Sequence, residues 1–248
     1  ELSITGTIDN INDRKLAEFK LQHLAMHDTL TGLYNRHYFD NELNQHCHTA
    51  TRYKIDHSLL YIDLDNFKVI NDSQGHQTGD MVLKEVANTL SKRLRESDIL
   101  CRIGGDEFAV ILPNTGVEHA LNIANDLCSL LANAHFQFDE NMYSVSASIG
   151  LTEIRCKGGD AQEYLKQADI ALYVAKNMGR NRVHCYSDDD RNSDEFKDSI
   201  KWAQKLRQAI INDDIVLHFQ PIVNIATEEI AYYEALVRLK VDGQLVFP

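Results

Sequence analysis

Two groups of acidic residues stand where strands of this sequence are expected to end. Asp63 follows the apolar run 58–62, and Asp106 and Glu107 occupy a glycine-containing turn between two further apolar runs. If these strands are neighbours in one sheet, the carboxylates meet at one edge. Carboxylates, water and substrate phosphates are the ligands that Mg2+ prefers, and two metal ions about 4 Å apart can polarise a phosphate and activate a hydroxyl. Acids are also ordinary solvated turn formers, so spacing alone leaves both interpretations open.

The surrounding pattern predicts an α/β domain that positions these acids. The run 58–63 is short and almost unbroken, which is typical of a buried central strand. Apolar residues at spacings of three and four predict a helix over about 79–95. Glycine in the turn 104–107 permits the positive φ angles of a hairpin. Further helices are expected over 117–133 and 161–178, and further strands over 99–103, 108–112, 143–151 and 183–185.

Composition excludes several classes of protein. The chain has 248 residues, a formal charge of −12 and no apolar run near the roughly 20 residues that span a bilayer. Nucleic-acid binding is not expected, because phosphate neutralisation needs Lys and Arg. No signal peptide is visible, and we expect no membrane contact by this fragment, although its parent is free to carry an anchor. The chain begins with Glu1 rather than Met, so we expect a fragment of a longer protein.

The cysteines indicate a reducing compartment. There are five of them, widely spaced and without a Cys-x-x-Cys pair, which favours free thiols and a cytoplasmic location. The run His46-Cys47-His48 is interpreted as structural, because neighbours on a helix point in different directions and zinc sites use wider spacings.

The turn Gly104-Gly105-Asp106-Glu107-Phe108 matches the signature of the GGDEF family of diguanylate cyclases without departure. The resemblance extends over most of 27–185, although His37 stands where a second Arg is frequent. It implies an α/β (α+β) fold with a central, mostly antiparallel sheet flanked by helices, as in nucleotidyl cyclases and the polymerase palm, followed by a partial C-terminal domain. The segments 28–36, 63–72, 75–80 and 168–181 resemble, in order, the N-terminal motif, the first strand and helix, the next motif and the last helix of the family.

The resemblance implies the condensation of two GTP molecules into cyclic di-GMP, with release of pyrophosphate. It assigns Asp63, Asp106 and the backbone carbonyl of Leu64 to a pair of Mg2+ (or Mn2+) ions in each half-site. Glu107 is a candidate ligand of the second ion, or the base that takes the proton of the ribose 3′-hydroxyl. Asp106 is the other candidate base, and the sequence leaves this choice open.

The resemblance also assigns the residues that hold the guanine of GTP. Asn71 and Asp80 are expected to read the guanine edge, because it presents both acceptors and N–H donors to an amide and a carboxylate. Gly104 and Gly105 are expected to let the backbone approach the nucleotide closely.

Three basic residues are expected at the triphosphate. Lys176 and Arg180 are four apart, so a helix would put them on one face, and Lys68 is expected to assist them. The alternative is a solvated helix end favoured by the helix dipole. Each domain of the family carries half a site, so we expect a homodimer to be required for catalysis.

A second site is expected at Arg95-Glu96-Ser97-Asp98, five residues before Gly104. The family's product-inhibition motif is Arg-x-x-Asp at this distance. Arg95 would bind a guanine or a phosphate of cyclic di-GMP in a bidentate manner, and Asp98 would contact guanine. The alternative is an exposed salt bridge at a helix end.

The ends of the chain resemble parts of other domains. Residues 1–12 are interpreted as the end of a PAS-type sensor domain and 13–26 as a linker helix, the alternative being an arbitrary strand and helix. Residues 27–187 are the cyclase domain and 188–193 a linker. Residues 194–248, helical to 212 with strands over 215–221 and 230–239, resemble the start of an EAL-family phosphodiesterase domain, through Phe219-Gln220-Pro221-Ile222-Val223 and Glu234-Ala235-Leu236-Val237-Arg238.

Two functions follow from these resemblances. The first is an active diguanylate cyclase with product inhibition. The second is a non-catalytic module that binds GTP or cyclic di-GMP and controls an adjoining EAL domain. Glu234 is a metal ligand of that domain in the full-length parent, but the later ligands are not in this chain, so we expect no phosphodiesterase activity from it.

Overall fold

The computed structural model describes residues 15, 24–138, 141–190, 202, 206–212, 214–225, 227–241 and 244–246. The chain divides after Ser187 into two compact units, and each is described here by itself. The expected PAS-type segment 1–12 lies outside the described residues. Of the expected linker helix, only residues 15 and 24–26 are described, and they are helical.

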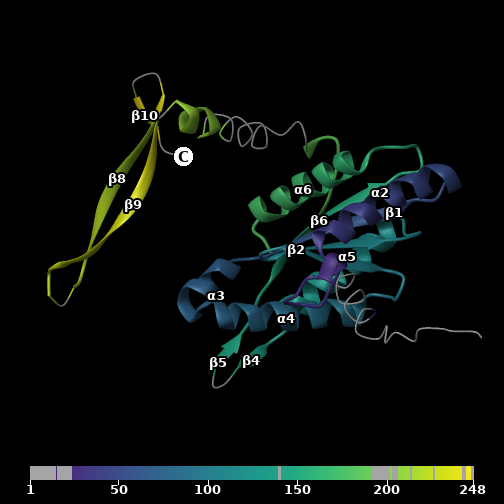
Figure 1. Cartoon of the computed structure of the whole chain (residues 1–248), viewed down its shortest axis with the longest axis horizontal. Coiled ribbons are helices and arrows are strands. Elements are labelled where there is room, and N and C mark those ends of the chain that lie inside the picture. The colour runs from purple at the N-terminus through teal and green to yellow at the C-terminus, as the bar shows by residue number, and fades with distance from the viewer. Residues whose placement is uncertain are drawn as a thin grey trace, which may run out of the picture. The chain divides into compact units, whose positions relative to one another are not determined.

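The first unit is built on a five-stranded sheet (Figure 1). Three of its strand pairs are antiparallel and the pair β6–β7 is parallel. The strands, in spatial order, are β2 (Ile99–Gly104), β3 (Glu107–Leu112), β1 (His57–Leu64), β6 (Ala147–Ile154) and β7 (Val183–Cys185). This mostly antiparallel sheet between helices confirms the expected fold class.

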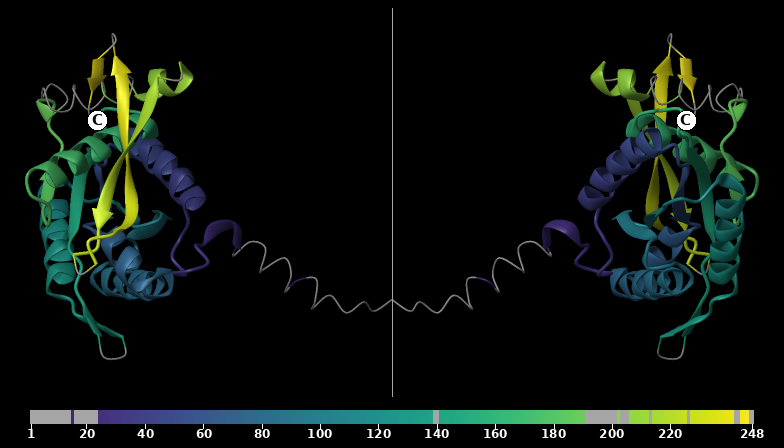
Figure 2. Two further views of the ribbon diagram at one scale, coloured as in Figure 1. Left: turned by 90° about the vertical axis from the view of Figure 1, so that its left-hand side faces the viewer. Right: turned by 90° about the vertical axis from the view of Figure 1, so that its right-hand side faces the viewer.

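Helices cover both faces of the sheet. α2 (Arg36–Tyr53) and α6 (Ala161–Asn177) pack on one face, and α4 (His76–Arg93) and α5 (Val117–Asn133) pack on the other. α3 (Phe67–Gln74) directly precedes α4. β4 (Phe136–Phe138) and β5 (Asn141–Tyr143) form a small hairpin that extends away from the sheet in both views of Figure 2.

The central strand β1 is buried from both sides, which explains its unbroken apolar run. Side chains alternate along a strand, so Leu60 and Ile62 join the core beneath α4 and α5, whereas Leu59 and Tyr61 join the core beneath α2 and α6. By the same alternation, Asp63 lies on the α6 face at the end of the strand. The packing of β1 therefore fixes the Asp63 carboxylate at the end of the strand, on the α6 face of the sheet.

Several expected elements coincide with the structure, and others differ. The expected helix 117–133 and strand 183–185 match α5 and β7. The expected strand 143–151 was misplaced: Tyr143 ends the short strand β5, and β6 begins only at Ala147 and runs to Ile154. The sequence pattern did not predict α2, whose buried positions are separated by many His, Asn and Thr residues of modest helix propensity.

The second unit contains a long antiparallel hairpin of β8 (Ile215–Val223) and β9 (Ile230–Val241), extended by β10 (Gln244–Val246). Both expected strands are present, and residues 206–211 are helical. Many apolar side chains of the hairpin are exposed, including Phe219 and Tyr232 at 62% each. In the parts of the chain that the structure describes, no helix combines the length and the apolar character that crossing a bilayer requires.

A buried histidine stands at the opposite end of β1 from the acids. His57 is 3% exposed, and its Nδ1 accepts a hydrogen bond of 2.8 Å from the backbone N–H of Asn114. Burial and the neighbouring His46 lower the pKa of His57, although Asp56 opposes them. A neutral ring is therefore part of the fold.

We expect the free energy of unfolding of this unit to decrease as the pH is lowered through the titration of His57. Its pKa is lower in the folded than in the unfolded protein, so the unfolded protein binds more protons between the two values. The free energy of unfolding in urea should be lower at about pH 5.5 than at about pH 7.5, on either side of the ordinary histidine pKa. His57→Asn keeps an acceptor for the N–H of Asn114 but does not titrate. The free energy of unfolding of this variant should therefore decrease less between the two pH values. Equal pH dependence in both proteins would contradict this assignment.

Candidate active site

The pairing of β1 with β3 brings the two groups of acids together. Asp63 lies directly opposite Glu107 in the antiparallel register, so both side chains share the α6 face of the sheet. The backbone N–H of Leu64 donates a hydrogen bond of 3.2 Å to the carbonyl of Asp106. The acids from separate parts of the sequence thus meet at one edge of the sheet.

The turn between β2 and β3 faces open space. Gly105 has a φ of 52°, a left-handed conformation that favours glycine. A Cβ atom added to Gly104 or Gly105 would meet no other atom within 4 Å. The backbone of the turn is therefore accessible to a ligand.

The side chain of an arginine on β2 holds the backbone of this turn in place. Arg102 donates hydrogen bonds of 3.1 and 2.8 Å from Nε and Nη2 to the carbonyl of Gly105, and its Nη1 lies 3.0 Å from Asp28 Oδ1. Asp28 also accepts hydrogen bonds from the backbone and hydroxyl of Thr31. Burial alone would raise the pKa of Asp28, but these donors outweigh it and the pKa is lowered. An ionised Asp28 thus connects the N-terminal motif to the turn.

The Asp63 carboxylate pairs with a cation from α6. Lys176 Nζ lies 2.8 Å from Asp63 Oδ2, and the Asp63 side chain is 13% exposed. Burial raises the pKa of Asp63; Lys176 opposes this, while Asp106 and Glu107 add to it. Asp106 and Glu107 are therefore near enough to disfavour the ionised form of Asp63, and Lys176 partly compensates for them.

The Glu107 carboxylate has a neutral partner. The hydroxyl of Tyr61 donates a hydrogen bond of 3.1 Å to Glu107 Oε2. Burial and the nearby Glu107 raise the pKa of Tyr61, so the phenol remains protonated and able to donate. The sequence pattern did not single out Tyr61; the only signal was a phenol within an otherwise apolar run.

The donors at this edge fit a hard divalent cation. The carboxylates of Asp63, Asp106 and Glu107 and the carbonyl of Leu64 are oxygen ligands of the kind that Mg2+ takes. Among the described residues, however, no three His, Cys, Asp or Glu side chains are gathered closely enough to hold an ion. Asp63 Oδ2 is instead paired with Lys176, whose positive charge opposes an entering cation.

The two residues expected to read guanine meet at the junction of α3 and α4. Asn71 is half-buried in α3, and Asp80 is exposed in the first turns of α4. A Cβ added to Gly79 would collide with the side-chain oxygen of Asn71 and contact the ring of Phe67. The Asn71 amide therefore lies against the backbone of Gly79, beside Asp80, and only glycine leaves room for it.

The expected helical pairing of Lys176 with Arg180 is wrong. α6 ends at Asn177, and Arg180 lies beyond it in a left-handed conformation with a φ of 62°. The chain leaves the helix through Gly179, whose φ is 110°, and the N–H of Asn181 then donates a hydrogen bond of 3.0 Å to the buried carboxylate of Asp65. Arg180 and Lys68 are both exposed, and in the described part of the chain neither forms an ion pair.

A buried carboxylate beside the site was also missed. Asp65 is 7% exposed and accepts hydrogen bonds from the hydroxyls of Ser146 and Ser148, at 2.7 and 2.6 Å, besides that from Asn181. It joins the end of β1 to β6 and to the turn after α6. The sequence showed an acid at position 65, but its hydrogen-bond partners could not be foreseen, because they lie 81 to 116 residues away in the chain.

The expected inhibitory motif forms a turn after α4. Asp98 Oδ2 accepts a hydrogen bond of 2.8 Å from the backbone N–H of Arg95, and among the described residues no ion pair joins their side chains. A pocket of about 290 Å3 lies between this turn and the N-terminal motif, with Gly32 and Tyr34 in its lining. The structure therefore does not contain the simple salt bridge that was the alternative.

Glu234, in the second unit, lies exposed on β9 opposite Gln220.

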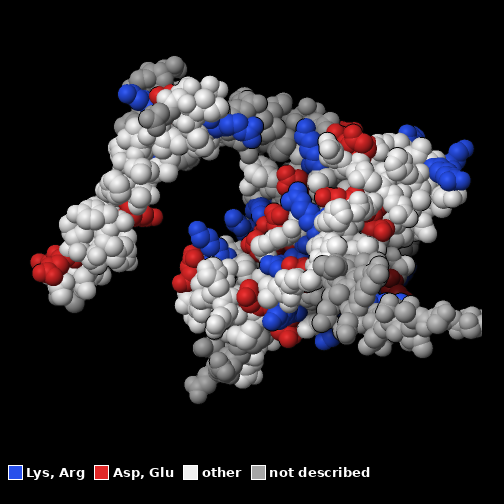
Figure 3. All heavy atoms as spheres, viewed as in Figure 1, with Lys and Arg blue, Asp and Glu red and all other residues white. Residues whose placement is uncertain are grey.

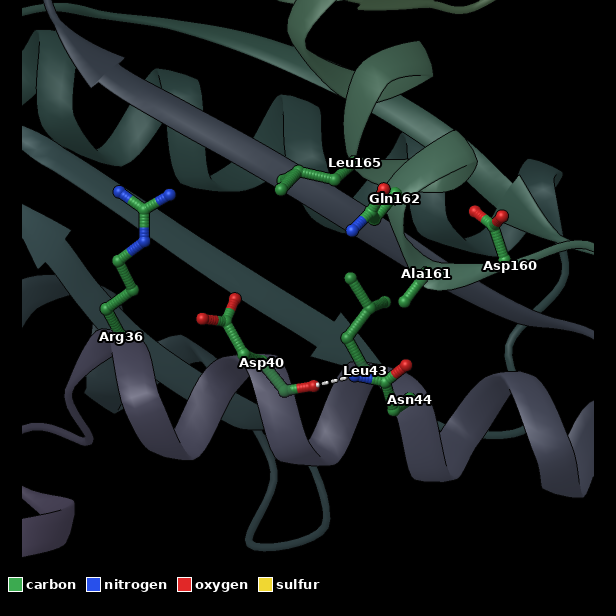
Figure 4. A pocket seen from close by; sticks show the side chains of 8 residues that line it. All are labelled: Arg36, Asp40, Leu43, Asn44, Asp160, Ala161, Gln162 and Leu165. Atoms are coloured by element: carbon green, nitrogen blue, oxygen red, sulfur yellow. Dashed lines mark hydrogen bonds between the residues drawn. The ribbon is translucent and has the colours of Figure 1, made fainter.

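A groove runs between α2 and the N-terminal end of α6. It has a volume of about 620 Å3, and Arg36 and Asp40 from α2 and Gln162 from α6 point into it (Figure 4). A second pocket of about 360 Å3 shares Arg36 and Gln162 and reaches Tyr61. Acidic and basic side chains are interspersed on the face of the first unit that Figure 3 shows.

Two curated relatives match this chain. It is 41% identical over 179 residues to "Probable diguanylate cyclase DgcE" of Escherichia coli, covering 72% of this chain and 16% of that protein. It is 36% identical over 256 residues to "Cyclic di-GMP phosphodiesterase PdeB" of Shewanella oneidensis, covering 100% of this chain and 29% of that protein. The chain thus spans less than a third of the length of either relative.

Solved structures resemble the first unit. The coiled coil and GGDEF domain of DgcB from Caulobacter crescentus, in complex with c-di-GMP, matches with a TM-score of 0.67 and 28% identity over 71% of this chain and 93% of that one. The GGDEF domain of TpbB (YfiN) from Pseudomonas aeruginosa matches with a TM-score of 0.64 and 35% identity over 67% and 97%. The family described as "Diguanylate cyclase, GGDEF domain" matches residues 25–182. The chain therefore belongs to the GGDEF family, and these residues are its diguanylate cyclase domain.

Proposed function

We propose that this chain is an active diguanylate cyclase that joins two GTP molecules into cyclic di-GMP. The observation that carries the proposal is the sheet edge at which Asp63 stands opposite Glu107, beside the open Gly104–Asp106 turn. The nearby junction of Asn71 and Asp80 supplies an amide and a carboxylate suited to guanine.

In the proposed reaction, the 3′-hydroxyl oxygen of one GTP forms a bond to the α-phosphorus of the other. The bond from that phosphorus to the bridging oxygen breaks, and pyrophosphate leaves with the electron pair. A second such step closes the ring. Each domain would present one GTP, so the active species is a homodimer, and catalysis is mainly positioning and charge stabilisation.

Two Mg2+ (or Mn2+) ions, when bound, would neutralise phosphate charge and acidify the attacking hydroxyl. Asp63, the Leu64 carbonyl, Asp106 and Glu107 would hold them, and Asp106 and Glu107 are the two candidate bases. Lys176 lies beside Asp63, where a phosphate would offer it a second anionic partner.

Lys68 and Arg180 would add positive charge around the triphosphate. Arg180 would do so from the turn after α6, and Lys68 from the first turn of α3. Gly104 and Gly105 would admit the nucleotide to the backbone of the turn.

A regulatory, non-catalytic role is the second candidate, because a relative matched by the whole chain is named a cyclic di-GMP phosphodiesterase. In this reading the domain binds GTP or cyclic di-GMP and controls an EAL domain that begins at about residue 194. The exposed apolar side chains of β8 and β9 support a larger domain that would cover them, with Glu234 as one of its metal ligands. The parent would be a cytoplasmic or membrane-anchored protein with a PAS-type sensor before the cyclase.

Removing the central acid should abolish turnover. We expect Asp106→Ala, or removal of divalent ions by a chelator, to lower pyrophosphate release from GTP by on the order of a hundredfold or more. Glu118→Ala removes an exposed acid of α5 and should leave the rate unchanged. The dimer content of each variant should be measured first. A dimeric wild-type chain that binds GTP but releases no pyrophosphate would favour the regulatory role.

Filling the space at Gly79 should weaken GTP binding. In Gly79→Ala the new methyl group must displace the Asn71 amide, and loss of one hydrogen bond to the base corresponds to roughly a three- to tenfold rise in KM for GTP. Gly116→Ala is the matched control, because a Cβ there meets nothing closer than 4.0 Å. Steady-state kinetics that show the same KM for both variants would contradict the guanine assignment.

Removing the arginine of the proposed product site should relieve feedback. We expect Arg95→Ala to retain initial turnover and to lose inhibition by added cyclic di-GMP. Arg93→Ala is a close control, because Arg93 lies two residues away and its guanidinium is paired with Asp126 at 2.6 Å. Inhibition of the Arg95 variant at wild-type concentrations of product would rule out this site.

A further inference from the structure

The phenol of Tyr61 is held in one place by its neighbours in the sheet. Tyr61 is 8% exposed and lies opposite Ala109 on β3 and Gly150 on β6, two small residues that leave room for its ring. A Cβ at Gly150 would collide with the backbone of Ala168 and Leu172, so α6 passes close above the same place. The orientation of the ring is thus set by packing rather than by its hydroxyl.

The hydroxyl of this ring reaches one acid of the active site. It donates a hydrogen bond of 3.1 Å to Glu107 Oε2, and no other described residue donates to this carboxylate. The second oxygen, Oε1, remains available at the edge where Asp63 lies opposite. One oxygen of Glu107 is therefore held, while the other can accept a cation or a proton.

The two facing acids have partners of different kinds. Asp63 pairs with the ammonium group of Lys176 at 2.8 Å, which competes directly with a metal ion for the carboxylate. Tyr61 carries no charge, so it can keep its hydrogen bond while Glu107 binds a cation. A free glutamate side chain must also lose rotational freedom on binding, and a rigid donor removes part of that loss beforehand.

We propose that Tyr61 is a positioning residue for Glu107, which it holds ready for its task in the metal-dependent reaction. This inference rests on the proposed function, in which Glu107 is a metal ligand or the base. In this role Tyr61 would act through the orientation of Glu107 and not through contact with the substrate or a metal ion.

The test is Tyr61→Phe, which removes the hydroxyl and keeps the ring. Mn2+ affinity should be measured by electron paramagnetic resonance in the presence of a non-hydrolysable GTP analogue, beside kcat and KM for GTP. We expect Mn2+ affinity and kcat to fall by on the order of tenfold, as for other groups that orient a metal ligand, with KM for GTP unchanged.

Tyr164→Phe is the matched control. Tyr164 is also buried on the α6 side of the sheet, but its hydroxyl bonds the backbone of Arg155 and Gly158 between β6 and α6. This variant should lower the thermal unfolding midpoint without changing Mn2+ affinity. A loss of Mn2+ affinity equal to that in Tyr61→Phe would mean that any lost buried hydroxyl has this effect, and it would overturn the inference.

Glu107→Gln separates the inference from the function on which it rests. If Glu107→Gln weakens Mn2+ binding and Tyr61→Phe adds nothing to it in the double variant, Tyr61 acts through Glu107. If Glu107→Gln weakens binding but Tyr61→Phe leaves it unchanged or makes it tighter, the positioning role is overturned and the metal site stands. If Glu107→Gln has no effect on Mn2+ affinity or kcat, the proposed role of Glu107 fails, and the inference fails with it.

Discussion

The antiparallel pairing of β1 with β3 is the constraint on which the rest of the site depends. It places Asp63 opposite Glu107, and side-chain alternation puts both on the α6 face. A shift of one residue would turn Asp63 toward the core beneath α4 and α5, so the two buried faces of β1 fix the register. The geometry of the acids is thus a consequence of ordinary core packing.

Bringing three carboxylates to one edge creates repulsion that the surrounding residues must offset. Lys176 does so with charge at Asp63, Tyr61 with a neutral hydrogen bond at Glu107, and Arg102 by fixing the backbone of the turn. These compensations differ in kind, so they respond differently to an incoming cation. The ammonium group of Lys176 repels a cation at Asp63, whereas the neutral phenol and the turn can stay in place.

Much of the fold was predictable from local pattern. The apolar run of β1, the periodicity of α5 and the glycines of the β2–β3 turn each follow from rules of burial and backbone conformation. The signature turn led to the family, and with it to the candidate residues. The local sequence pattern could not predict contacts between residues that lie far apart in the sequence.

Three features show why those contacts were missed. The partners of Asp65 come from β6 and from the turn after α6, which are far from it in the sequence. Tyr61 looked like one more buried residue until β3 placed Glu107 beside it. α2 has too many polar residues for its periodicity to stand out, and its identity as a helix comes from packing on the sheet.

The ion pair of Arg102 with Asp28 connects the N-terminal segment of the domain to the turn between β2 and β3. One guanidinium bonds both the Gly105 carbonyl and a carboxylate only two residues after the helical segment 24–26. The side chain of Arg102 therefore joins the entering chain directly to the loop that carries Asp106, in addition to the backbone hydrogen bond from Arg102 to Tyr34 that ties the same motif to β2. A rotation of the entering segment would act on the loop through one guanidinium group as well as through the sheet.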